Sequence, residues 1–238
     1  MTSATNQLGT GILRTLLAGE PLALRASVEE WKLRRVAIYL GTVALGAGLY
    51  GAAMGAWRAP LQAVYVALKL PIILLLTSLA NSLLNAMLAP LLGVNIGWRQ
   101  SFLAILMSFT SAAAILGSFS PLIGFLVWNS PPLGSTQSGW AYSFILLTHV
   151  LVIAFAGVVG NLRLWQLLRQ LSGSPAAALR VLLAWLAGNL LFGSELSWLL
   201  RPFIGSPALP VEFLRATAFK GNFFEAVYDS AMKILSSN

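Results

Sequence analysis

The chain has 238 residues, of which 58% are hydrophobic and 9% are charged, and its mean hydropathy is +0.79. Soluble domains carry roughly 25% charged residues, and a chain of this length could not shield such an apolar excess from water, so the composition excludes an ordinary soluble protein. The lack of cysteine excludes disulfides, thiolate metal sites and cysteine nucleophiles, and a single histidine excludes a multi-histidine metal or haem site within one chain.

The formal net charge is +8, from 15 basic and 7 acidic residues. Most basic residues flank apolar stretches, where they are typical of contacts with anionic lipid headgroups rather than with nucleic acid. The first 35 residues lack the uninterrupted apolar region and cleavage site of a secretory signal. We therefore expect an integral membrane protein whose first spanning helix is its own insertion signal.

Residues 1–35 are predicted to form a cytoplasmic amphipathic segment. Beside Arg14, a short apolar face suited to the membrane interface consists of Ile12, Leu13, Leu16 and Leu17. Further along, Ser27 and Glu30 have the spacing of a capping box. This spacing predicts a helix that begins at Ser27 and continues into the first span.

Residues 36–200 are predicted to form an all-α transmembrane bundle. A bilayer core needs about 20 apolar residues per helix. Five apolar runs of about this length occur, at 36–57, 68–92, 101–127, 140–160 and 181–200. Tryptophan prefers the membrane interface, and five tryptophans lie at or beside these ends, namely Trp57, Trp98, Trp128, Trp140 and Trp198.

The distribution of basic residues predicts the orientation of the bundle. The densest cluster precedes the first span and consists of Arg14, Arg25, Lys32, Arg34 and Arg35. The positive-inside rule then places the N-terminus in the cytoplasm, and five spans place the C-terminus outside. A composition rich in Ala, Leu, Gly and Arg suggests a bacterial inner membrane.

Small residues form one face of the first span. Gly48, Gly51 and Gly55 lie there together with Gly41 and Ala52. In a membrane such a face lets two helix backbones approach closely. The neighbour is either another helix of the same chain or a helix of a second copy or partner subunit.

A polar stripe runs along the second span. Ser78, Asn81, Ser82 and Asn85 recur at helical spacing and therefore share one face. Unpaired amides are costly in hydrocarbon, so this face must meet protein or water. It either bonds to a neighbouring helix, with Ser108 and Ser111 of the third span as candidate partners, or lines a polar path that would continue to Glu195.

Three ionisable residues within or beside the spans are candidates for function. His149 lies midway along the fourth span, where it is either satisfied by a hydroxyl such as that of Thr148 or by a carbonyl of another helix, or binds a pigment or haem or relays protons. Lys69 and Glu195 are expected at one level near the outer interface. They would form an ion pair, extend separately to the interface, or contribute to a coupling-ion or proton site.

Residues 201–238 are predicted to form a cap that ends in a short amphipathic helix. Asn222 and Glu225 have the spacing of a helix cap. The apolar stripe that follows consists of Phe224, Val227, Tyr228, Ala231, Ile234 and Leu235. This helix would lie on the membrane or on the bundle, or dock a partner subunit.

Residues 67–125 carry a family resemblance. They contain a Lys-x-Pro entry at Lys69 and Pro71, a glycine turn that leads to Trp98, Arg99, Gln100 and Ser101, and a span interrupted at Ser120 and Pro121. These features resemble the Yip-domain family of five-helix membrane proteins and related bacterial proteins. The resemblance implies five spans, a cytoplasmic N-terminus and a role in membrane organisation or trafficking, without catalytic residues.

The sequence as a whole favours a non-enzymatic function. It contains neither an HExxH motif nor a Walker loop. We expect a scaffold or accessory subunit of a membrane complex, with no cofactor, in contact with the lipid bilayer and with partner subunits or a second copy. The alternatives are a small channel or transporter with a polar path along Asn81, Asn85 and Glu195, and a pigment- or haem-binding subunit that uses His149.

Overall fold

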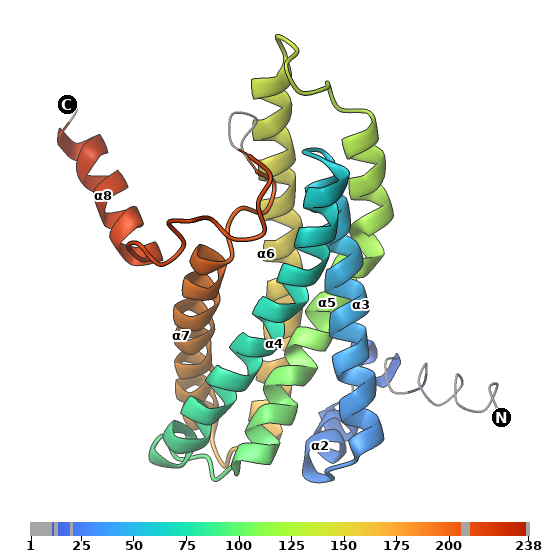
Figure 1. Cartoon of the computed structure of the whole chain (residues 1–238). Coiled ribbons are helices and arrows are strands. Elements are labelled where there is room, and N and C mark those ends of the chain that lie inside the picture. The colour runs from blue at the N-terminus through green and yellow to red at the C-terminus, as the bar shows by residue number, and fades with distance from the viewer. Residues whose placement is uncertain (1–10, 12–13, 20, 206–209, 237–238) are drawn as a thin grey trace.

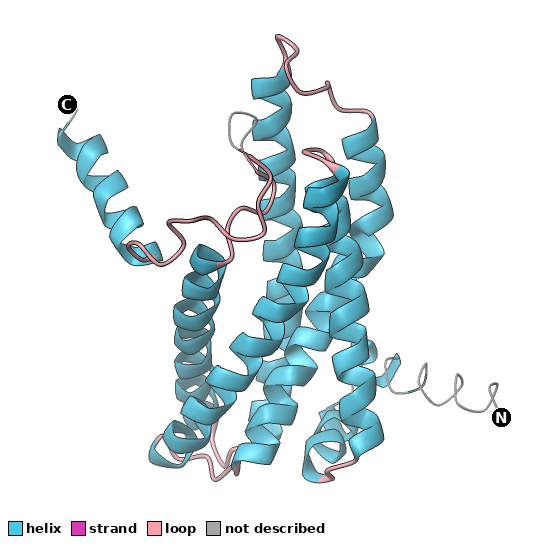
Figure 2. Ribbon diagram, in the orientation of Figure 1, coloured by secondary structure: helices cyan, strands magenta, loops and turns pink. Residues whose placement is uncertain are grey.

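The computed structural model describes residues 11, 14–19, 21–205 and 210–236, and within these ranges its regular structure is entirely helical. Figure 1 shows the helices in chain order and Figure 2 their connecting loops. The helices are α2 (Pro21–Glu29), α3 (Leu33–Ala56), α4 (Pro60–Leu91), α5 (Trp98–Trp128), α6 (Ser138–Leu171), α7 (Pro175–Leu199) and α8 (Phe223–Ser236).

Five of these helices, α3 to α7, are long and apolar enough to cross a membrane. They confirm the five predicted spans and form the bundle of a multi-pass membrane protein. The exposed faces of α4 and α6 are rich in leucine and valine, which suits contact with lipid. The five interfacial tryptophans also lie at helix ends, as at Trp98 and Trp128, the first and last residues of α5.

All five helices extend beyond the predicted spans, and α4, α6 and α7 extend furthest. α4 begins at Pro60 rather than at residue 68, because proline suits the first turn of a helix. α6 continues to Leu171 and α7 begins at Pro175, so Arg163, Arg169 and Arg180 lie within helices. Most of the predicted apolar runs end at or near charged residues. Helices continue past such residues, as α6 and α7 do, because long basic side chains extend to the membrane interface.

Glycines let α3 pack closely on both of its main neighbours. A Cβ added to Gly46 would lie 2.2 Å from the carbonyl oxygen of Ala113 in α5. On the other side, a Cβ added to Gly51 would lie 2.5 Å from the carbonyl oxygen of Val66, and Gly48 and Gly55 also face α4 backbone. Gly48, Gly51 and Gly55 of the predicted face therefore pack within the chain, whereas a Cβ added to Gly41 would have no atom within 4 Å. Gly46 was not among the predicted packing residues.

The predicted helix start at Ser27 is wrong. Ser27 lies near the end of α2, and α3 begins at Leu33 after a short break. The Arg35 side chain donates a hydrogen bond of 2.7 Å to the Ser27 carbonyl, near the end of α2. Leu24 and Val28 are buried, so apolar packing turns α2 back under the bundle. Ile12 and Leu13 lie outside the described residues.

After α7 the chain crosses the bundle before it forms α8. We call residues 200–205 and 210–222 the C-terminal segment. The side-chain oxygen of Asn222 accepts a hydrogen bond of 2.8 Å from the Glu225 backbone N–H, which confirms the predicted cap. α8 projects away from the bundle (Figure 1). The side chains of Ala231, Ile234 and Leu235 lie outside the described residues.

Candidate functional site

The polar stripe of α4 faces α7. The Asn81 side-chain nitrogen donates to the Trp185 carbonyl at 3.0 Å and to the Asn189 side-chain oxygen at 2.6 Å. The Asn85 side chain donates in turn to the backbone carbonyl and the side-chain oxygen of Asn81. Asn81 and Asn85 are fully buried, and Gly188 leaves room for the amide of Asn81, whose oxygen lies 2.0 Å from where a Cβ would be. The polar stripe therefore bonds α4 to a neighbouring helix, which is the helix-packing alternative.

The predicted partners of this stripe, Ser108 and Ser111, do not bond to it. The Ser111 hydroxyl donates to the Met107 carbonyl of its own helix at 3.1 Å. Ser108 faces α6, where a Cβ added to Gly160 would lie 2.8 Å from its carbonyl oxygen. The sequence signal for the true partner was the pair Gly188 and Asn189 in the fifth span. The Asn189 amide, like that of Asn81, needs a hydrogen-bond partner inside a span.

The ion pair between Lys69 and Glu195, one of the three arrangements considered for these residues, is not formed in the described part of the chain. Lys69 is fully buried, and its ammonium donates to the Pro202 carbonyl at 2.9 Å. Glu195 is partly exposed on α7, and the ion pairs found among the described residues, Arg25–Glu29 and Lys32–Glu30, involve neither group. The partner of the Lys69 ammonium is therefore a backbone carbonyl rather than the Glu195 carboxylate, because the C-terminal segment returns to α4.

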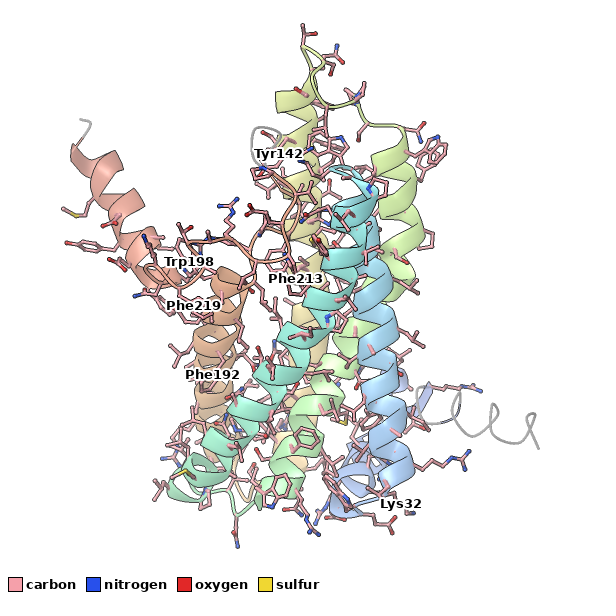
Figure 3. The ribbon with its side chains drawn as sticks, viewed as in Figure 1. Lys32, Tyr142, Phe192, Trp198, Phe213 and Phe219 are labelled. Carbon is pink, nitrogen blue, oxygen red and sulfur yellow. The ribbon has the colours of Figure 1, made fainter. Side chains whose placement is uncertain are left out.

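Two further kinds of contact hold the C-terminal segment against α4, namely hydrogen bonds from Gln62 and aromatic rings around Lys69. The Gln62 side chain donates to the carbonyls of Pro202 and Phe203, at 3.0 and 2.5 Å. Three aromatic rings surround the Lys69 ammonium, with centroids 5.1 to 6.0 Å away, and belong to Tyr65, Phe203 and Phe213. Figure 3 shows Phe213 in this segment, to the right of Trp198 at the end of α7 and below Tyr142 on α6.

A cavity of about 420 Å³ lies beside this contact. Its wall combines Met54 of α3, Leu70 of α4, one face of α6, the end of α7 and residues 202–205. The α6 residues Leu146, Val150 and Ile153 are 42 to 55% exposed on the outer surface of the helix. The cavity therefore opens sideways, towards the region that lipid occupies, and most of its lining is apolar.

His149 is the buried polar residue of this wall. Its side chain is 3% exposed, and Nδ1 lies 2.8 Å from the Tyr50 hydroxyl of α3. The predicted partner Thr148 instead donates to the Phe144 carbonyl of its own helix. Nε2 of His149 has no hydrogen-bond partner among the described residues.

The pairing with Tyr50 defines what Nε2 can offer. When the Tyr50 hydroxyl donates to Nδ1, the neutral imidazole carries its proton on Nε2, and every group except that N–H is satisfied. The reverse arrangement would leave the buried phenol proton unpaired as well. We therefore assign Nε2 as a donor that points away from Tyr50 and has no acceptor within the described part of the chain.

Arg215 supplies a positive charge to the wall, which also contains Tyr142. The neighbouring Arg201 stacks on Trp198, with its guanidinium 3.6 Å from the ring centroid, and donates to the Trp198 carbonyl at 2.7 Å. Burial, together with the charge of Arg215, lowers the pKa of Arg201 below its usual value. The cavity thus combines an apolar wall, a neutral donor at His149 and a cation at Arg215.

Comparison of the chain with protein-family models, with curated proteins and with solved structures found no match. The resemblance to Yip-domain proteins therefore stays a prediction.

Proposed function

We propose that this protein is a non-enzymatic membrane protein that binds a membrane-soluble ligand in the cavity beside His149. The observation that carries the proposal is that His149, whose buried Nε2 has no hydrogen-bond partner among the described residues, is one of the residues that line a cavity opening towards lipid. Ligand sites of this kind have volumes of about 300 to 1,000 Å³, apolar walls and a few polar groups. The cavity beside His149 has these properties.

The unpaired donor supports binding on energetic grounds. A buried donor without a partner costs about 1–3 kcal/mol. A ligand with a carbonyl or carboxylate oxygen would remove this cost, while its apolar part would cover Leu70, Val150 and Ile153. The proposal assigns the site no bond-making or bond-breaking step, and it includes a pigment or haem as one class of ligand.

The test is extraction of the bound ligand. The protein is purified from its host in a mild detergent, the visible spectrum is recorded, and an organic extract is analysed by mass spectrometry. We expect one ligand per chain in the wild type and in Thr148→Val, whose side chain is bonded to its own helix, and at least a fivefold loss in His149→Leu. Equal ligand content in all three proteins would contradict the proposal.

A role as an accessory subunit is the second candidate function, and α8 is the observation that favours it. Phe224, Val227 and Tyr228 are exposed on α8, which projects from the bundle. Such a face suits a partner subunit or the membrane surface. Native mass spectrometry of the wild type and of a chain that ends at residue 222 tests this role. We expect a partner to be lost with α8, and a chain that is always alone would contradict the role.

We further propose that the bundle lies in a bacterial inner membrane with the N-terminus in the cytoplasm and the C-terminus outside. The basic cluster before α3 supports this orientation. It places the His149 cavity in the outer half of the bilayer.

A further inference from the structure

The ligand of the His149 cavity has a recognisable chemistry, which follows from the basic residues around it. Lys69 lies on α4, and Arg201 and Arg215 lie in the C-terminal segment. The positive charge of Arg215 acts on both Lys69 and Arg201. Among the described residues, no carboxylate lies within 4.0 Å of any of them. Glu212, the acid nearest to Arg215 in sequence, forms no ion pair with it.

The three cations differ in what they already contact. Lys69 donates to the Pro202 carbonyl and is enclosed by rings. Arg201 donates to the carbonyls of Trp198 and Thr217 and stacks on Trp198. Arg215 lines the cavity, and its guanidinium has no hydrogen bond within the described residues. Arg215 is therefore the cation that a molecule in the cavity would meet.

The apolar wall connects this cation to the unpaired donor. Leu70, Leu146, Val150 and Ile153 line the same cavity as Arg215 and His149, and α6 exposes part of this wall to lipid. A molecule that satisfies all three features has an anionic group, a further acceptor oxygen and a hydrocarbon chain. Anionic glycerolipids carry a phosphate, an ester carbonyl and acyl chains, and they reach the cavity from the bilayer.

We infer that the cavity binds an anionic lipid, with the acidic headgroup on Arg215, an ester carbonyl on the Nε2–H of His149 and an acyl chain along α6. The inference rests on the proposed function and names its ligand class. Guanidinium binds phosphate through paired, charge-assisted hydrogen bonds. A lipid with the same chains but no net charge would keep the contacts to α6 and His149 and would gain less from Arg215.

The test measures headgroup preference. The purified protein is delipidated and titrated with phosphatidylglycerol and with phosphatidylcholine of the same acyl chains, and native mass spectrometry counts the lipid bound. Both lipids carry a phosphate, but the choline ammonium of phosphatidylcholine offsets the attraction of its phosphate for Arg215. We therefore expect the wild type to bind phosphatidylglycerol about tenfold more tightly. Arg215→Gln should bring this preference close to parity, and Arg215→Lys should retain most of it.

Two further variants separate the site from general electrostatics. Arg169→Gln makes the same charge change at the far end of α6, where Arg169 stacks on Trp165. It should leave the preference unchanged. His149→Leu should weaken both lipids several-fold while keeping their ratio. Thermal unfolding of each variant verifies that it is folded, and Arg215→Lys keeps the test open if Arg215→Gln does not fold.

The outcomes that overturn the inference are distinct from those that overturn the proposed function. Equal, His149-dependent binding of both lipids would show that the site does not recognise the net negative charge of the headgroup, which contradicts the inference alone. Displacement of phosphatidylglycerol by millimolar inorganic phosphate would identify a free anion as the ligand and also contradict it. An equal effect of Arg169→Gln and Arg215→Gln would show nonspecific attraction. Lipid binding that is unchanged in His149→Leu would contradict both the inference and the proposed function.

Discussion

Asn81 forms hydrogen bonds that join α4 to α7, and it also accepts a hydrogen bond from Asn85 and thereby orients it. In hydrocarbon, neither helix finds water as a substitute partner. This arrangement explains why two amides one turn apart are tolerated inside a span.

Replacement of Asn81 by leucine should therefore destabilise the bundle by about 1–2 kcal/mol, the range of interhelical hydrogen bonds in membranes. Asn161→Leu is the matched control, since the Asn161 amide donates to the Gly157 carbonyl of its own helix and, among the described residues, bonds to no other helix. Unfolding in a series of detergent mixtures measures both. An Asn161 variant as unstable as the Asn81 variant would contradict the interhelical role.

Lys69 should contribute little to stability although it is fully buried. Its ammonium has one carbonyl partner, and that carbonyl also accepts from Gln62. Lys69→Met removes a charge that is costly to bury and leaves the Pro202 carbonyl paired, so we expect a change of less than about 1 kcal/mol in unfolding free energy.

Gln62→Leu should release the C-terminal segment more readily than Lys69→Met, because it leaves the Phe203 carbonyl without its donor. Limited proteolysis after residue 200 compares the two variants. Faster cleavage of the Lys69 variant would show that the ammonium, rather than the amide, holds the segment.

At the scale of elements, α3 packs closely on both α4 and α5, and these two contact faces depend on missing Cβ atoms. Gly46 contacts α5, and Gly117 of α5 would place a Cβ 2.8 Å from the Gly46 Cα. Such close crossings exclude any side chain at either position.

The substitution Gly46→Ala should destabilise the bundle by about 1–3 kcal/mol, as overpacking does in a dense core. Gly41→Ala is the control on the same helix, because an added Cβ there has no atom within 4 Å. It should be neutral or stabilising by up to about 1 kcal/mol, since alanine favours the helix more than glycine does. Effects of the same sign in both variants would contradict the packing argument.

For the molecule as a whole, five spans require the connections after α3 and α5 to lie on the opposite side from those after α4 and α6. The chain has no cysteine, so single cysteines can be introduced without background. Under the proposed orientation, Thr136→Cys in the loop between α5 and α6 should react with a membrane-impermeant maleimide in intact cells. Gly173→Cys, between α6 and α7, should react only after the membrane is opened. Labelling of both from one side would contradict five spans.

The structure was predictable from the sequence to the extent that each feature is local. Apolar runs of about 20 residues, tryptophans at their ends and the cap at Asn222 all depend on neighbours along the chain, and the structure confirms them. The predicted start at Ser27 failed although it was local, because burial of Leu24 and Val28 outweighed the capping pattern.

The sequence by itself determined the class of the protein, because lipid acts on every residue according to its own hydrophobicity. Only the tertiary structure decided which polar groups meet. Asn81 meets Asn189 across 108 positions, Lys69 meets Pro202 across 133, and His149 meets Tyr50 across 99. Nothing in the local pattern selects one distant partner over another, since that choice depends on how five helices and a returning segment fill the same space. The unpaired nitrogen of His149, and with it the candidate site, exists only as a result of that packing.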